Sequence, residues 1–139
     1  MERALVIGGS RFFGERLAER LRQAGCHVTL INRHGRGPGD RLIAADRNDV
    51  AVLAPQIAGE RWDAIFDLAA YRPRDCVSAF ELFGKATDRY VLVSSIAVYR
   101  LGRELTEDDF KPGSFVIPDA THRRLSYADG KRAVEALFT

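Results

Sequence analysis

The sequence predicts an α/β domain built on a doubly wound parallel sheet. Strand-like and helix-like segments alternate from the first residues onward, which is typical of βαβ units. The strand-like segments are continuously apolar, as expected of strands that helices cover on both faces. With 139 residues, 46% of them hydrophobic and 29% charged, the chain is long enough for one packed core and too short for two domains.

The first part of the chain is predicted to hold three strands and two helices. Phe13, Leu17 and Leu21 recur every four residues, which predicts a helix with one apolar stripe, and Gly25 is its expected end. Pro55 can disturb the last turn of the second helix. In chain order, we expect a strand at 3–7, the helix around 13–21, strands at 28–31 and 42–45, and a helix at 49–57, with a glycine-rich loop at 35–40.

The alternation continues in the second part of the chain. Cys76, Phe80 and Phe83 form an apolar stripe that Gly84 closes, and they predict a third helix. The expected order is a strand at 64–66, this helix, a strand at 90–93, an irregular polar segment at 100–119 and a helix at 127–138.

Composition excludes several classes of protein. The net charge of +2 provides no strongly basic face, which argues against a nucleic-acid partner. No apolar run reaches the roughly 18 residues of a membrane span, so no membrane association is expected. Cys26 and Cys76 are too few for a disulfide framework or a metal site, and no signal-peptide pattern is present. We therefore expect a protein of the reducing cytoplasm without a metal.

A glycine-rich turn at residues 8–14, between the first strand and the first helix, predicts a dinucleotide-binding site of the Rossmann type. Gly8 would permit the tight turn, and Gly14 would let the helix pack close to the sheet. Free N–H groups at the helix N-terminus would face a pyrophosphate. Arg11 stands where the pattern has its middle glycine. An ordinary turn between a strand and a helix is the alternative.

The residues after the second strand predict which cofactor is bound. NAD requires a carboxylate there for the ribose hydroxyl, but this chain has Asn32 and Arg33. The guanidinium of Arg33 can pair with a 2′-phosphate, which favours NADP over NAD. A solvated loop arginine is the alternative. Asp46, after the third strand, would either accept from the adenine amino group or cap a helix.

Ser95, Tyr127 and Lys131 form a candidate catalytic set. Tyr127 and Lys131 lie four residues apart, on one face of the predicted helix. An ammonium beside a phenol favours the phenolate, which can exchange a proton with an alcohol or carbonyl. Ser95 follows the fifth strand, at the sheet edge where open α/β sheets bind ligands, and could donate to the same oxygen. An exposed helix pair without a catalytic role is the alternative, although this spacing arises by chance only about 0.09 times in such a chain.

Taken together, these motifs resemble the N-terminal part of an extended short-chain dehydrogenase/reductase, of the NAD(P)-dependent nucleotide-sugar epimerase/dehydratase kind. The resemblance covers the whole chain. The matching motifs are the turn at 8–14, Asp-Leu-Ala-Ala at 67–70, Ser-Ser-Ile-Ala-Val-Tyr at 94–99, Thr-Glu-Asp at 106–108, and Tyr127 to Lys131 followed by Arg132 and Glu135.

The resemblance implies a hydride taken from a sugar carbon by the cofactor and often returned to it. Tyr127 would be the acid/base, Lys131 would activate it and hold the nicotinamide ribose, and Ser95 would orient the substrate oxygen. The implied substrate is a nucleotide-linked sugar. The cofactor contacts expected from the motifs and the resemblance are Gly8, Arg11, Phe13, Gly14, Asn32, Arg33, Asp46, Leu68, Ala69, Ala70 and Lys131.

Two departures from the family pattern set further expectations. Arg11 occurs in a branch that includes the RNA-binding chloroplast stem-loop-binding proteins, so a non-catalytic NAD(P)-binding regulatory or RNA-binding module is the alternative function.

Family members also continue with further strands and a substrate domain. We therefore expect residues 1–139 to be an incomplete Rossmann domain, truncated before a C-terminal substrate domain and inactive alone. Val134, Leu137 and Phe138 would then be partly exposed, and a homodimer contact could cover them.

Overall fold

The computed structural model describes residues 1–118 and 125–139 and divides into two compact units. The first unit comprises residues 1–69 and 77–93, and the second comprises residues 70–76 and 94–139. The elements are β1 (Arg3–Ile7), α1 (Phe12–Gln23), β2 (His27–Asn32), β3 (Arg41–Ala44), α2 (Val50–Ile57), β4 (Ala64–Asp67), α3 (Pro73–Phe83), β5 (Tyr90–Leu92), the short 3-10 helices η1 (Ile96–Val98), η2 (Glu107–Asp109) and η3 (Pro112–Ser114), and α4 (Tyr127–Phe138).

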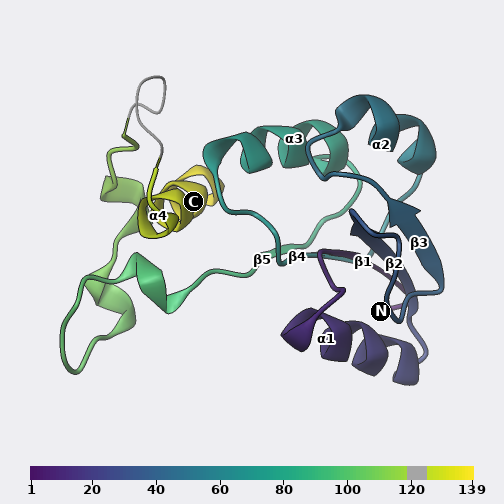
Figure 1. The fold of residues 1–139 in the computed structure, drawn as a ribbon, viewed down its shortest axis with the longest axis horizontal. Helices are drawn as coiled ribbons and strands as arrows, with labels where there is room; N and C mark the ends of the chain where they lie inside the picture. The colour runs from purple at the N-terminus through teal and green to yellow at the C-terminus, as the bar shows by residue number, and fades with distance from the viewer. Residues whose placement is uncertain (119–124) are drawn as a thin grey trace. The chain divides into compact units, whose positions relative to one another are not determined.

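All five strands of the first unit form one parallel sheet in the order β3-β2-β1-β4-β5. Helix α1 covers one face of this sheet, and α2 and α3 lie on the opposite side (Figure 1). The predicted doubly wound α/β fold is therefore confirmed. The strand order reverses between β1 and β4, and sheets of this kind bind ligands outside the carboxyl ends of the strands at such a point.

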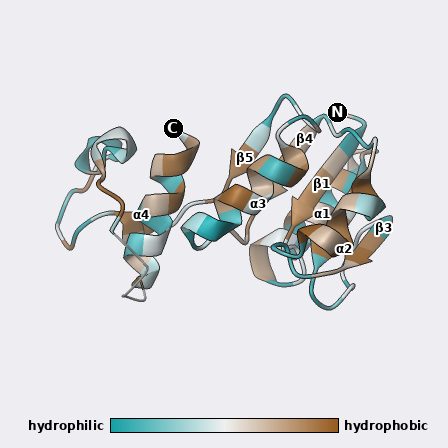
Figure 2. Ribbon diagram, turned by 90° about the horizontal axis from the view of Figure 1, so that it is seen from above, coloured by the Kyte–Doolittle hydropathy of each residue, from teal (hydrophilic) through white to brown (hydrophobic). Residues whose placement is uncertain are grey.

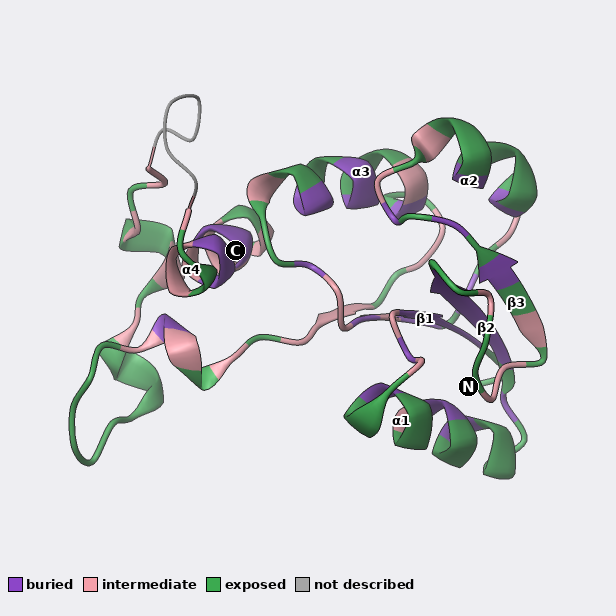
Figure 3. Cartoon of the chain, in the orientation of Figure 1, coloured by how far each residue is buried: buried purple, intermediate pink, exposed green. Residues whose placement is uncertain are grey.

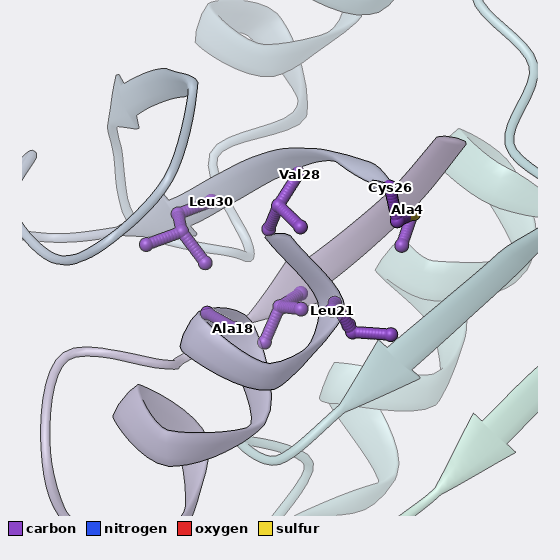
Figure 4. Packing of buried hydrophobic residues seen from close by; sticks show 7 residues of the cluster. Ala4, Ala18, Leu21, Cys26, Val28 and Leu30 are labelled. Carbon is purple, nitrogen blue, oxygen red and sulfur yellow. The ribbon is translucent and has the colours of Figure 1, made fainter. Parts of the chain in front are cut away.

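The core between α1 and the sheet consists of small and branched side chains (Figure 4). Successive strand residues face opposite sides of the sheet, so alternate residues of β1 and β2 point toward α1. Both strands are buried along their length after the first residue (Figure 3). This cluster contains Ala4, Val6, Ala18, Leu21, Cys26, Val28 and Leu30.

Two predicted stripe residues are not in the core. The side chain of Phe13 is 60% exposed and that of Phe80 is 49% exposed. In α1 the buried positions are Gly14, Ala18 and Leu21, because Gly14 has to face the turn before the helix. The four-residue repeat of apolar side chains alone could not show which face of the helix is turned toward the sheet.

Helix α4 also differs from the expectation that its apolar face is exposed. Val134 is fully buried, because α4 packs against η1 and η3 of the second unit. Leu137 is exposed, as expected. The η2 and η3 turns lie in the segment predicted to be irregular, of which Asp119 is outside the described residues.

The helices carry both polar and apolar residues (Figure 2). Among the described residues, no helix combines the length and the apolar character needed to cross a membrane. Cys26 and Cys76 are both buried and neither forms a disulfide, and burial raises the pKa of the Cys26 thiol.

Candidate functional site

The glycine turn follows the carboxyl end of β1, beside the point where the strand order reverses. Gly8 and Gly9 have φ angles of +105° and +63°, which glycine adopts without steric cost. The N–H of Gly8 donates to the carbonyl oxygen of Ile31 at 2.9 Å, which ties the turn to β2. A Cβ on Gly14 would lie 2.7 Å from the Cα of Gly9, so only glycine lets α1 approach the turn this closely.

This geometry fits a dinucleotide cofactor. Arg11 is the N-cap of α1, is exposed, and makes no side-chain capping hydrogen bond. The first N–H groups of a helix have no partner within the helix, and they favour negative charge. Phe12 has a φ of +49°, a left-handed conformation that is uncommon outside glycine and costly for a bulky residue. The turn thus combines close backbone packing with a helix start that suits a pyrophosphate.

The end of β4 lies against the same turn. The N–H of Leu68 donates to the carbonyl oxygen of Ile7 at 3.0 Å. A Cβ on Gly8 would contact the side chains of Leu68 and Ala69, at 3.4 and 3.7 Å. The turn, Leu68 and Ala69 therefore lie together in the first unit.

A buried ion pair between Arg47 and Asp67 lies at the end of β4, next to Ala69. The sequence reasoning did not predict it. Arg47 Nη1 donates to both carboxylate oxygens of Asp67, at 2.5 and 2.6 Å, and the hydroxyl of Tyr90 donates to Asp67 Oδ2 at 2.6 Å. Asp67 is fully buried and also accepts from the N–H of Ala69 at 2.9 Å. Burial, and then the neighbouring charge of Asp67, raise the pKa of Tyr90 far above its usual value. A buried aspartate needs a charged or hydrogen-bonding partner. The position of Asp67 at the end of an apolar strand was therefore a sign in the sequence that such a partner exists.

Of the three residues expected to contact the ribose and the adenine, Asn32 is buried, whereas Arg33 and Asp46 are exposed. Asn32 is buried, and its side chain donates to the carbonyl oxygen of Arg36 at 2.9 Å and accepts from the N–H of His34 at 3.1 Å. Its amide therefore shapes its own loop. Arg33 is exposed beside it. Asp46 is exposed and accepts from the N–H of Asn48 at 2.9 Å, which is a local turn contact.

The second unit holds the candidate acid/base residues. Lys131 is only 1% exposed, and its Nζ donates to the carbonyl oxygen of Ala70 at 2.9 Å. Tyr127, on the same helix, is 56% exposed, and its ring lies 6.2 Å from the ring of Tyr71. A Cβ on Gly130 would collide with the carbonyl oxygen of Tyr71. The glycine lets α4 lie directly against residues 70 and 71.

Ser95 caps η1 in the same unit. Its hydroxyl oxygen accepts from the N–H of Ala97 at 3.2 Å, and its hydroxyl proton is still available for donation. Arg132 of α4 donates to the carbonyl oxygens of Val98 and Tyr99, at 2.7 and 3.1 Å. The structure therefore joins the segment that carries Ser95 to the helix that carries Tyr127.

The remaining motif residues of this unit bind one another. The hydroxyl of Ser94 donates to Glu135, and that of Tyr99 donates to Glu107 at 3.0 Å. The hydrogen bond to Glu107 raises the pKa of Tyr99. Sequence reasoning did not assign roles to Gly130 and Tyr71, although a glycine inside a helix was a visible sign of close packing.

Comparisons with known proteins agree with this geometry. Residues 4–81 match the model of the NAD dependent epimerase/dehydratase family. No curated protein gives a significant match to the sequence. Among solved structures, an epimerase from Methanothermobacter thermautotrophicus is 17% identical with a TM-score of 0.73, over 99% of this chain and 46% of its own. The enzyme WbmG of Bordetella bronchiseptica, in complex with NAD, is 20% identical with a TM-score of 0.69, over 97% and 48%.

A third structure, the UDP-glucose-4-epimerase of Stenotrophomonas maltophila with bound NAD and formylated UDP-arabinopyranose, is 16% identical with a TM-score of 0.72. The match covers 99% of this chain and 48% of the epimerase. The chain thus spans about half the length of these structures, and at this identity the likeness establishes the fold. The family match extends over most of the first unit, including the glycine turn and the end of β4. This chain belongs to the NAD dependent epimerase/dehydratase family.

Proposed function

We propose that this chain supplies the cofactor turn and the acid/base residues of an NAD(P)-dependent epimerase or dehydratase that acts on a nucleotide-linked sugar. The observation that carries the proposal is the burial of Lys131 on the same helix as Tyr127. Burying an ammonium is costly because it loses its hydration, and the hydrogen bond of Lys131 to the Ala70 carbonyl offsets part of that cost. A lysine held in this way four residues after an exposed tyrosine supports a functional role for the pair.

Residues of the first unit would hold the cofactor. The turn at Gly8 to Gly14 would bind the pyrophosphate, and Ala69, whose side chain lies close to Gly8, would border the cofactor. Arg33 is exposed after β2 and would pair with a 2′-phosphate, which favours NADP. When bound, the nicotinamide supplies the group that takes a hydride from a sugar carbon and can return it.

The side chains of the second unit would transfer the proton of the sugar hydroxyl. The phenolate of Tyr127 would accept the proton of a sugar hydroxyl as the carbon is oxidised, and would return it in the reverse direction. The ammonium of Lys131 would stabilise that phenolate. Ser95 would donate its hydroxyl proton to the same substrate oxygen. Two of the similar structures are named as UDP-glucose 4-epimerases, which supports a nucleotide-linked sugar as the substrate class.

The proposal is tested on the natural full-length protein with Tyr127→Phe and Lys131→Met. Turnover of a panel of UDP-sugars should fall by about 10²–10⁴-fold for Tyr127→Phe, the size of a general acid–base contribution. Cofactor affinity, followed by the fluorescence of bound NADPH or NADH, should be unchanged in this variant. Lys111→Met is the matched control, because Lys111 is exposed, and it should behave as the wild type. Near-normal turnover of Tyr127→Phe would refute the acid/base role.

One observation favours a second candidate function. The exposed Arg11 replaces the middle glycine of the turn, as in the RNA-binding branch of the family. A non-catalytic module would bind RNA with a strong dependence on salt, and its binding would weaken in Arg11→Gly. An electrophoretic shift at several salt concentrations, with and without NADPH, distinguishes this module from the enzyme.

A further inference from the structure

We infer that Tyr71 is a positioning residue for the Tyr127–Lys131 pair, and that its aromatic ring, rather than its hydroxyl, performs this task. The inference rests on the proposed function and deepens it. Tyr71 follows the Asp-Leu-Ala-Ala motif, and none of the motifs assigns it a role.

The ring of Tyr71 contacts both members of the pair. Lys131 Nζ lies over the ring at 5.6 Å from its centroid, within the range of a cation–π interaction. The ring of Tyr127 lies 6.2 Å from the same ring, tilted by 42°, which is a favourable aromatic distance. Tyr71 itself is 47% exposed. The buried ammonium is therefore bordered by the carbonyl oxygen of Ala70 on the main chain and by an aromatic face.

The main chain at Tyr71 is held in place from two sides. The N–H groups of Tyr71 and Arg72 both donate to Asp75 Oδ2, at 2.7 and 2.9 Å, and Asp75 is buried. On the other side, Gly130 of α4 packs against the carbonyl oxygen of Tyr71 so closely that a Cβ would not fit. Glycine is a poor residue for a helix interior, so this contact is the evident reason for its presence. The main chain that carries the ring is thus fixed relative to α4.

The charged groups around the pair have partners of their own. The Asp75 carboxylate accepts from the main chain of residues 71 and 72. Asp129 accepts from Arg132 at 3.0 Å, and Glu135 accepts from Ser94. The π-face of Tyr71 is an electrostatic partner of the Lys131 ammonium, and it positions this group for its role with Tyr127.

This assignment predicts a contrast between two substitutions. Phenylalanine presents a π-face like that of tyrosine, so Tyr71→Phe should retain kcat within about two-fold. Leucine has no such face, so Tyr71→Leu should lower kcat by about ten-fold, the size of one partly buried cation–π interaction. Because the cation then stabilises the phenolate less, the acidic limb of the kcat/KM profile should move up by about one pH unit. KM for the sugar nucleotide should be unchanged.

The decisive readout does not depend on activity. In the natural protein, the ε-methylene NMR resonance of Lys131, assigned with Lys131→Arg, should be displaced upfield by the ring current of Tyr71. The displacement should persist in Tyr71→Phe and disappear in Tyr71→Leu. If Tyr71→Leu does not fold, as judged by circular dichroism, Tyr71→Met replaces it with a longer ring-free side chain.

Equal kcat and equal Lys131 resonances in Tyr71→Phe and Tyr71→Leu would overturn the inference while Tyr127→Phe stays inactive. Full activity of Tyr127→Phe would instead overturn the proposed function. A tenfold loss in Tyr71→Leu with an unmoved Lys131 resonance would also reject a role through the ammonium. The two levels of the account therefore fail in distinguishable ways.

Discussion

Substitution of Asp67 by asparagine tests whether the buried ion pair with Arg47 holds the end of β4 against the glycine turn. The change keeps the shape of the side chain but removes the charge. Arg47 is only 9% exposed, so its guanidinium would lose the carboxylate that it faces in the interior. Breaking a buried pair in this way costs about 3–5 kcal/mol. For a domain with a typical stability of about 5–15 kcal/mol, that is a large share of the whole.

The assay is urea unfolding followed by the fluorescence of Trp62, the single tryptophan, which is buried. With an m-value of about 1–2 kcal/mol per molar urea, the midpoint should fall by about 1.5 M or more. Asp88→Asn is the matched control. Asp88 pairs with Arg61 at 3.2 Å on the surface, where its side chain is 96% exposed, and such pairs contribute at most about 1 kcal/mol.

A double variant separates the charge from the packing. In Asp67→Asn combined with Arg47→Met, neither charge of the buried pair remains, so part of the lost stability should return. A loss below about 1 kcal/mol in the single variant, or strictly additive losses in the double variant, would refute the reasoning.

Three further predictions follow from the first unit. The raised pKa of Tyr90 keeps its phenol protonated in the folded state, whereas the unfolded chain ionises near pH 10; stability measured by urea unfolding should therefore decline as the pH rises above about 10, and Tyr90→Phe should remove that component of the slope. NADPH should bind about ten-fold more tightly than NADH in calorimetry, the equivalent of roughly 1.4 kcal/mol, and Arg33→Ala should abolish the preference; equal affinities in the wild type would reject it. Gly14→Ala should cost about 1–3 kcal/mol because its Cβ meets backbone atoms, whereas Gly113→Ala, with open space around it, should leave the thermal midpoint nearly unchanged.

The strands could be predicted from the sequence because continuous apolar runs between turn residues are a strong local signal. The helix faces were harder to predict. Phe13 and Phe80 fit the apolar repeat and yet are exposed. What orients α1 is the close contact between Gly14 and Gly9, which depends on the fold of the turn and not on hydrophobicity.

The motif residues of the candidate site could also be located from their spacing, because a helix places Tyr127 and Lys131 on one face. Their partners could not. Arg47 meets Asp67 from a distant loop, and Tyr71 meets Lys131 from the start of another segment. Such contacts arise from tertiary packing, and no local period in the sequence records them.

The central claim is that this chain binds a nicotinamide dinucleotide at the turn after β1, and direct titration tests it best. Calorimetry of the wild-type protein with NAD, NADH, NADP and NADPH should show saturable binding of one dinucleotide per chain by at least one form. Gly14→Ala should weaken this binding, and the exposed-site control Gly113→Ala should keep it. If the folded wild-type protein binds none of the four forms, or if Gly14→Ala binds as tightly as the wild type, the account is contradicted.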